Sequence, residues 1–213
     1  SVLPKDKSLI GFVGGPWTLF VYAREGSHAG SLIQSKADVG LFHLFLEKLY
    51  PLLKANIQLQ LNAGAEIVMI FDTAAGEVSP AFYQQEIQGV LTKLAQDFPN
   101  QVGYYSKGTQ ASFFNDSFRN LPWVGMGVDH RWNLPDAFKI LPQGFVQGNF
   151  DQSLLFQDEA SFKKSLETYL QMMKQFSPGQ RAGWVSGLGH GVLPKTPEKH
   201  VKYFVQRVRE VFT

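Results

Sequence analysis

Short apolar runs alternate with amphipathic segments along the whole chain. A continuous apolar run at residues 65–71 is bounded by Gly64 and by a polar stretch that begins at Asp72, which is typical of a strand covered on both faces in a parallel sheet. Further runs of similar character bring the expected strands to six: 9–13, 66–71, 102–105, 123–127, 144–148 and 182–186. Helical patterns separate these runs, so the sequence predicts an α/β fold with parallel strands.

Between the expected strands, apolar residues recur at the spacing of a helix face. The first strand leads into a helix near Trp17, and residues 35–63 form one expected long amphipathic helix. Ser79-Pro80 opens the next helix, which ends near Pro99. The remaining expected helices are a short one at 110–118, then 134–141, 159–176 and a final helix from about 196 toward Phe212.

Each expected strand ends in a loop that contains Gly, Asp or Ser. The carboxyl ends of parallel strands share one rim of an α/β barrel, and this rim is where such barrels carry their chemistry. A closed barrel of this class has eight strands, and six are expected here. We therefore expect a partial (β/α)8 barrel that forms one domain over residues 1–213. The sequence begins with a strand almost at once and without Met, so we expect that two βα units are missing from its front.

The first strand ends in a glycine-rich corner. Residues 11–22 read GFVGGPWTLFVY, with Gly14 and Gly15 directly before Pro16. Glycine allows a backbone to approach a ligand closely, Pro suits the first turn of a helix, and the N–H groups that follow point outward. The corner is therefore either part of a pocket or a turn with a purely structural role.

Three side chains near the expected rim are candidates for chemistry. Tyr22, on the helix side of the corner, either contacts a ligand or packs its ring with its hydroxyl on water or backbone. Thr73 follows Asp72 past a buried strand, where a threonine is a ligand contact or a cap. His190 is the strongest candidate, because it follows a strand within GLGHG and a histidine can hold a carboxylate or move a proton near neutral pH.

Other polar residues give weaker signals. Asp129 and Asp151 end strands and are either acids or caps. The remaining histidines are less favoured than His190: His28, His43, His130 and His200. His43 and His200 lie in expected helices, and His28 lies in the loop at 24–35. A metal site made of histidines alone would need a convergence that the sequence does not show, so we expect no metal.

Composition narrows the classes of function. The formal net charge is +2 without a long run of Lys or Arg, so the footprint of a nucleic-acid binder is missing, while a small anionic ligand would suit the positive bias. The absence of cysteine excludes disulfides, a thiol nucleophile and thiolate-bound zinc. The 18 phenylalanines predict an aromatic core. Neither a signal-peptide pattern nor a membrane-length apolar window occurs, so we expect a cytoplasmic protein without a membrane partner.

Several motifs, in this order, resemble the uroporphyrinogen decarboxylase family: GFVGGPWT at 11–18, FDTAAG at 71–76, QGNFD at 147–151, LGHG at 188–191 and PEKHV at 197–201. Each alone is weak, but together they are specific and span nearly the whole chain. The resemblance implies a (β/α)8 barrel, often a homodimer, with its cleft at the C-terminal face. It also implies an enzyme of haem biosynthesis that works without metal or organic cofactor and converts the four acetate side chains of uroporphyrinogen III to methyl groups, giving coproporphyrinogen III.

The resemblance also implies roles for individual residues. Tyr22 matches the family's active-site tyrosine after PWT, and His190 matches its histidine in LGHG, so both are the expected catalytic residues. Thr73 stands where many members have a serine, which keeps the hydroxyl and adds a methyl group. With the corner glycines, the expected substrate-binding set is Gly14, Gly15, Tyr22, Thr73 and His190. The family's N-terminal arginine-bearing motif and its pyrrole-facing aspartate have no counterpart here, so this chain would supply part of the site.

Two other functions stay open at this point. A zinc- or cobalamin-linked methyltransferase would share the fold, although such enzymes generally bind zinc through cysteine, which this chain lacks. The other is a non-catalytic remnant that binds a porphyrin or a partner. An open arc of six strands would expose strand edges, so we expect a homodimer or completion by a missing N-terminal segment.

Overall fold

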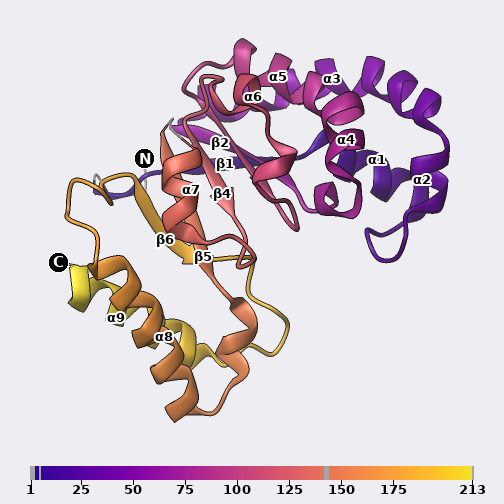
Figure 1. The fold of residues 1–213 in the computed structure, drawn as a ribbon. Coiled ribbons are helices and arrows are strands. Elements are labelled where there is room, and N and C mark those ends of the chain that lie inside the picture. The colour runs from indigo at the N-terminus through magenta and orange to yellow at the C-terminus, as the bar shows by residue number, and fades with distance from the viewer. Residues whose placement is uncertain (1–2, 5, 142–143, 213) are drawn as a thin grey trace.

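The computed structural model describes residues 3–4, 6–141 and 144–212, and within them six parallel strands form one sheet flanked by helices (Figure 1). The strands are β1 (Ile10–Gly14), β2 (Ile67–Asp72), β3 (Val102–Ser106), β4 (Gly125–Val128), β5 (Phe145–Phe150) and β6 (Trp184–Leu188). Each strand pairs with the next in sequence order. The six predicted strands are therefore confirmed, and the architecture is a partial α/β barrel.

The described helices follow the strands in alternation. They are α1 (Pro16–Glu25), α2 (Ile33–Ala37), α3 (Val39–Asn62), α4 (Pro80–Phe82), α5 (Gln88–Asp97), α6 (Asp116–Arg119), α7 (Leu134–Ile140), α8 (Glu159–Lys174) and α9 (Glu198–Phe212). A π-helical turn at Tyr83–Ile87 joins α4 to α5, and short 3₁₀ turns lie at Ala75–Glu77, Ala111–Phe113 and Gln152–Phe156. The predicted helix start at Ser79-Pro80 is confirmed, because the Ser79 hydroxyl accepts the Phe82 N–H at 3.2 Å and caps α4.

Two predicted helices are wrong in their extent. The expected single helix over 35–63 is divided at Asp38, whose backbone leaves the helical region (φ −124°, ψ 65°). Its carboxylate accepts the Leu41 N–H at 3.0 Å, so Asp38 caps α3 and cannot continue α2. The expected helix over 110–118 is likewise a 3₁₀ turn followed by α6, because Asn115 caps α6 by accepting the Phe118 N–H at 2.9 Å.

Two clusters of buried side chains in the described chain hold the helices to the sheet. The larger cluster lies between the sheet and the helices from α1 to α8. The smaller one joins the end of β5 to α8 and α9. These two helices lie side by side near the C-terminus (Figure 1). In it the Phe162 ring stacks on His200 at 4.5 Å, and the His200 ring bonds to the Leu155 carbonyl at 2.8 Å. The predicted aromatic core is confirmed, and His200 belongs to it.

Among the described residues, β1 and β6 are the two edges of the sheet. Apolar side chains near these edges are exposed, including Phe12 at 66% and Val185 at 38%. The rings of Phe12, Phe71 and Tyr105 follow one another across β1, β2 and β3 at 5.9 and 5.7 Å. The inner face of the arc is thus an aromatic surface that is open beside β1.

A buried hydrogen-bond network ties the corner after β1 to the end of β2. Asp72 is fully buried, and its Oδ1 accepts both the Thr18 N–H at 3.2 Å and the Thr18 hydroxyl at 2.6 Å. The Thr18 oxygen in turn accepts the Ala74 N–H at 3.0 Å. A Cβ on Gly15 would lie 2.6 Å from the Asp72 Cβ, so glycine is required for this contact. The network holds the residues on both sides of Thr73.

The buried carboxylate of Asp72 meets a second hydroxyl on its other oxygen. Tyr104 donates to Asp72 Oδ2 at 3.3 Å, and Tyr83 donates to the Tyr104 oxygen at 3.0 Å. Burial raises the pKa of Asp72 to about 6, and the hydrogen bonds from Thr18 and Tyr104 oppose that rise. Folding therefore favours the protonated form of this side chain.

We expect Thr18→Val to lower the free energy of unfolding by about 1–3 kcal/mol, because it removes the hydroxyl donor from the buried Asp72 carboxylate and leaves the Ala74 N–H without a partner. Thr18→Ser keeps the hydroxyl and should lose less. Urea unfolding of the three proteins measures the difference, and equal losses for both variants would show that the hydroxyl has no such role.

The pKa of Asp72 leads to a stability prediction that depends on pH. Because the folded-state pKa is raised from 3.8 to about 6, this group's stabilising contribution is complete below about 3.8 and is lost as the pH rises through about 6. Asp72→Asn removes the titration, so its unfolding free energy relative to the unchanged chain should increase between pH 5 and pH 7. Urea unfolding across this range tests it, with the exposed Asp136→Asn as control. Parallel pH profiles for Asp72→Asn and the unchanged chain would contradict the account.

Candidate active site

A cavity of about 510 Å³ lies at the carboxyl ends of the strands. Its lining comes from all the strands after β1 and from the loops that follow β2 and β6: Phe71, Thr73, Tyr105, Val128, Gln147, Leu188, His190 and Gly191. Hollows of similar volume on the outer faces of α8 and α9 are each lined by side chains of a single helix and its end. The strand-end cavity is the one that brings Thr73 and His190 together, as expected for residues of one rim.

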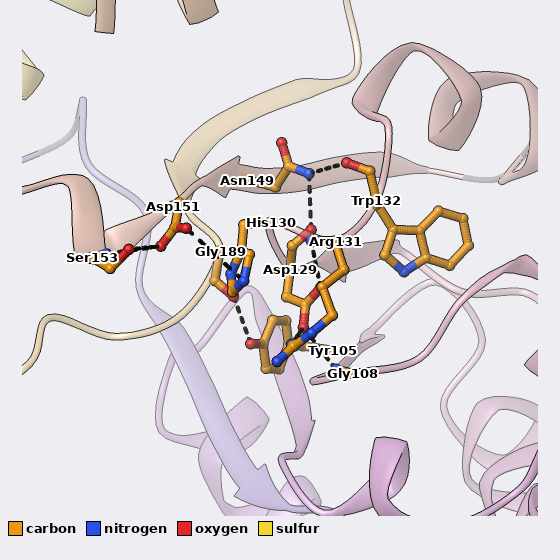
Figure 2. A network of polar contacts seen from close by, with 10 residues as sticks. All are labelled: Tyr105, Gly108, Asp129, His130, Arg131, Trp132, Asn149, Asp151, Ser153 and Gly189. Carbon is orange, nitrogen blue, oxygen red and sulfur yellow. Dashed lines mark hydrogen bonds and ion pairs between the residues drawn. The ribbon is translucent and has the colours of Figure 1, made fainter. Parts of the chain in front are cut away.

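The position of His190 is set by the residue before it. Gly189 donates its N–H to the Phe150 carbonyl at 2.7 Å. Its own carbonyl accepts the Tyr105 hydroxyl at 2.7 Å (Figure 2). A Cβ on Gly189 would lie 2.5 Å from the His130 nitrogen, so only glycine fits there. The loop is therefore held at both backbone groups of Gly189, and the half-buried His190 side chain reaches the cavity.

Asp129 anchors the loops beside the cavity (Figure 2). Its carboxylate is buried, accepts the Gly108 N–H at 2.7 Å and the Arg131 N–H at 2.9 Å, and forms an ion pair with the Arg131 guanidinium. The Asn149 amide donates to the carbonyls of Asp129 and Trp132 at 2.9 and 2.8 Å. Asp129 therefore has a structural role, in which it joins the loops after β3 and β4 to β5.

Asp151 also serves as a cap. One carboxylate oxygen accepts the N–H and the hydroxyl of Ser153 at 2.8 and 2.7 Å. Its other oxygen lies 4.0 Å from His130 Nε2, which makes an ion pair when His130 is protonated (Figure 2). The His130 Nδ1 atom is buried without a hydrogen-bond partner in the described chain.

Tyr22 lies outside the cavity lining and is 44% exposed. Its hydroxyl oxygen is 2.5 Å from His28 Nδ1, in the loop between α1 and α2. Partial burial and the charges of Lys107 and His190 lower the pKa of His28, while Glu77 opposes this. Tyr22 is thus connected to the neighbourhood of His190 through His28. The sequence gives no reason to favour His28, because a polar loop carries no signal for the tertiary contacts that this histidine makes.

The corner glycines have packing roles in this structure. A Cβ on Gly14 would lie 2.7 Å from the Leu19 side chain, and one on Gly15 would meet Asp72. These contacts explain the two glycines without a ligand, and the part of the corner in substrate binding stays a prediction.

The remaining histidine lies away from this site. His43 on α3 pairs with Glu86 at 3.0 Å on the outer surface. No group of three or more His, Asp or Glu side chains in the described ranges is arranged to hold a metal ion. No helix in the same part of the chain has both the length and the apolar character needed to cross a bilayer.

Comparisons with known proteins agree with the motifs. The sequence matches the family described as uroporphyrinogen decarboxylase (URO-D) over residues 1–211. It is 30% identical to the uroporphyrinogen decarboxylase of Thermus thermophilus over 95% of this chain and 60% of that protein. It is 34% identical to the uroporphyrinogen decarboxylase of Helicobacter acinonychis over 97% of this chain and 61% of that protein. The chain thus spans about 60% of the length of these curated relatives.

Two solved structures share the fold. A methyltransferase from Methanosarcina mazei superposes with a TM-score of 0.63 at 16% identity, over 100% of this chain and 61% of that one. A putative vitamin-B12 independent methionine synthase from Listeria monocytogenes superposes with a TM-score of 0.61 at 13% identity, over 99% of this chain and 66% of that one. At such identities the likeness concerns the fold alone, so it does not favour a methyltransferase.

Proposed function

Because the chain belongs to the uroporphyrinogen decarboxylase family, we propose that it forms part of a site that decarboxylates the four acetate side chains of uroporphyrinogen III to give coproporphyrinogen III. The observation that carries this proposal is the strand-end cavity, in which the Thr73 hydroxyl and the His190 imidazole share one lining. Both groups can hydrogen-bond a carboxylate. The reaction needs no metal or organic cofactor in this proposal.

The walls of the cavity suit a flat macrocycle with charged side chains. Phe71, Tyr105 and Leu188 supply apolar surface for pyrrole rings, while Thr73 and His190 supply polar groups at defined points. The substrate carries eight carboxylates, and Lys107 adds positive charge near His28. An apolar wall beside a few polar groups also strengthens each hydrogen bond by excluding water.

In the proposed mechanism the chain orients the reacting acetate. Thr73 and His190 hold its carboxylate so that the bond to be broken stands across the pyrrole plane. Protonation of the pyrrole carbon makes a cationic ring, the electron pair of the carbon–carboxylate bond then moves into that ring, and carbon dioxide leaves. A further proton on the exposed methylene carbon completes the methyl group. We assign to Thr73 and His190 the orienting role, with Tyr22 as a carboxylate contact at the edge of the same site.

We further propose that the protein works in the cytoplasm and that the open inner face of the arc is covered, in a homodimer or by further strands. The exposed Ile10, Phe12 and Val185 side chains support a cover, since uncovered apolar strand edges promote association.

The test is the reaction itself, with the natural protein that contains this sequence. We expect it to convert uroporphyrinogen III to coproporphyrinogen III, and His190→Asn to slow the reaction by about 10- to 100-fold, most of all for the later acetates. Chromatography of the oxidised porphyrins separates the intermediates by carboxylate number, and His43→Asn is the matched control on the outer surface. No product from the unchanged protein would contradict the function, and unchanged rates at all four steps in His190→Asn would remove this residue from the site.

A further inference from the structure

Tyr22 and His28 form a side-chain contact between α1 and the loop that follows it, near the cavity. Tyr22 lies in the last part of α1, and His28 lies in the loop that follows. Their rings are 5.3 Å apart, and the 2.5 Å between Tyr22 Oη and His28 Nδ1 is a hydrogen-bond distance. The Tyr22 side chain is exposed and His28 is half-buried, so the pair is accessible to a ligand.

Charged and titratable groups from three other elements act on His28. Lys107 comes from the loop after β3, His190 from the loop after β6, and Glu77 from the 3₁₀ turn after β2. Partial burial has the largest effect on His28 and lowers its pKa. Lys107 and His190 lower the pKa further because they disfavour a second positive charge nearby, and Glu77 raises it. In the free chain His28 is therefore mainly neutral at pH 7.

We propose that Tyr22 and His28 form a carboxylate-binding pair that takes up one proton when an anionic ligand binds. The inference rests on the proposed function, because it takes the ligand to be a tetrapyrrole with several carboxylates. It adds a binding residue, His28, and a dependence of binding on pH.

The hydrogen bond between the two side chains explains the proton uptake. In neutral His28 with its proton on Nε2, Nδ1 accepts the Tyr22 O–H, so the phenol has no proton left to donate to a ligand. When a proton from solvent binds Nδ1, the direction reverses and the imidazolium donates to Tyr22 Oη. The Tyr22 O–H is then free to donate to a carboxylate.

A bound carboxylate makes this change favourable. Negative charge beside His28 raises its pKa and offsets the repulsion from Lys107 and His190. A hydrogen bond from Tyr22 to a charged group is also stronger than one to a neutral ring. Ligand binding and protonation of His28 therefore support each other, and the affinity falls as the pH rises through the pKa of His28 in the complex.

The experiment measures proton uptake on binding of uroporphyrin III, the stable oxidised macrocycle with the same eight carboxylates. Titration calorimetry at pH 7 in two buffers of different ionisation enthalpy gives the number of protons bound per ligand. With the natural protein that contains this sequence, we expect uptake to be larger, by up to about one proton, than in His28→Gln. His28→Gln should also show a flatter loss of affinity between pH 6 and pH 8.

Two variants make the result specific. His43→Gln removes a surface histidine far from this pair and should behave like the unchanged protein. Tyr22→Phe keeps the ring and loses the donor, and should bind uroporphyrin about 10-fold more weakly at pH 6. Equal proton uptake by the unchanged protein and His28→Gln would overturn this inference and leave the proposed function standing. Absence of uroporphyrin binding by the unchanged protein at every pH would overturn both.

Discussion

A buried carboxylate must find hydrogen-bond donors inside the protein, and this requirement organises the rim of the sheet. Asp72 at the end of β2 accepts hydrogen bonds from the N–H and the hydroxyl of Thr18. These bonds hold the first turn of α1 against the neighbouring strand. Asp129 after β4 meets it with Gly108 and Arg131, which joins the loops after β3 and β4. The strand-end loops are thus connected by two acids that are themselves withdrawn from the cavity.

The groups that face the cavity sit directly beside these anchors. Thr73 lies between Asp72 and Ala74, both of which bond to Thr18. His190 follows Gly189, which is held by Phe150 and by the Tyr105 hydroxyl. The roles of these polar groups differ with their burial. The fully buried ones stabilise the loops, and the half-exposed ones remain available to a ligand. The Tyr22–His28 pair, at the end of α1 and in the loop that follows it, is such a half-exposed group.

Much of the fold could be predicted from the sequence, because buried parallel strands leave continuous apolar runs. The helix pattern was less informative, since apolar spacing continues across Asp38 although the chain turns there to cap α3. The positions of Thr73 and His190 followed from strand ends and family motifs. The roles of Asp72 and His28 could not be predicted in this way. Thr18 and Asp72 are 54 residues apart, and the neighbours of His28 come from three separate loops. Such contacts exist only in the folded chain.

The proposed function requires that a tetrapyrrole binds in the strand-end cavity. A crystal structure of the natural protein that contains this sequence, with coproporphyrin III bound, tests it most directly. We expect the macrocycle to lie against Phe71 and Leu188, with carboxylates at Thr73 and His190 and another at Tyr22 and His28. A porphyrin bound elsewhere, with this cavity empty or filled by protein side chains, would contradict it.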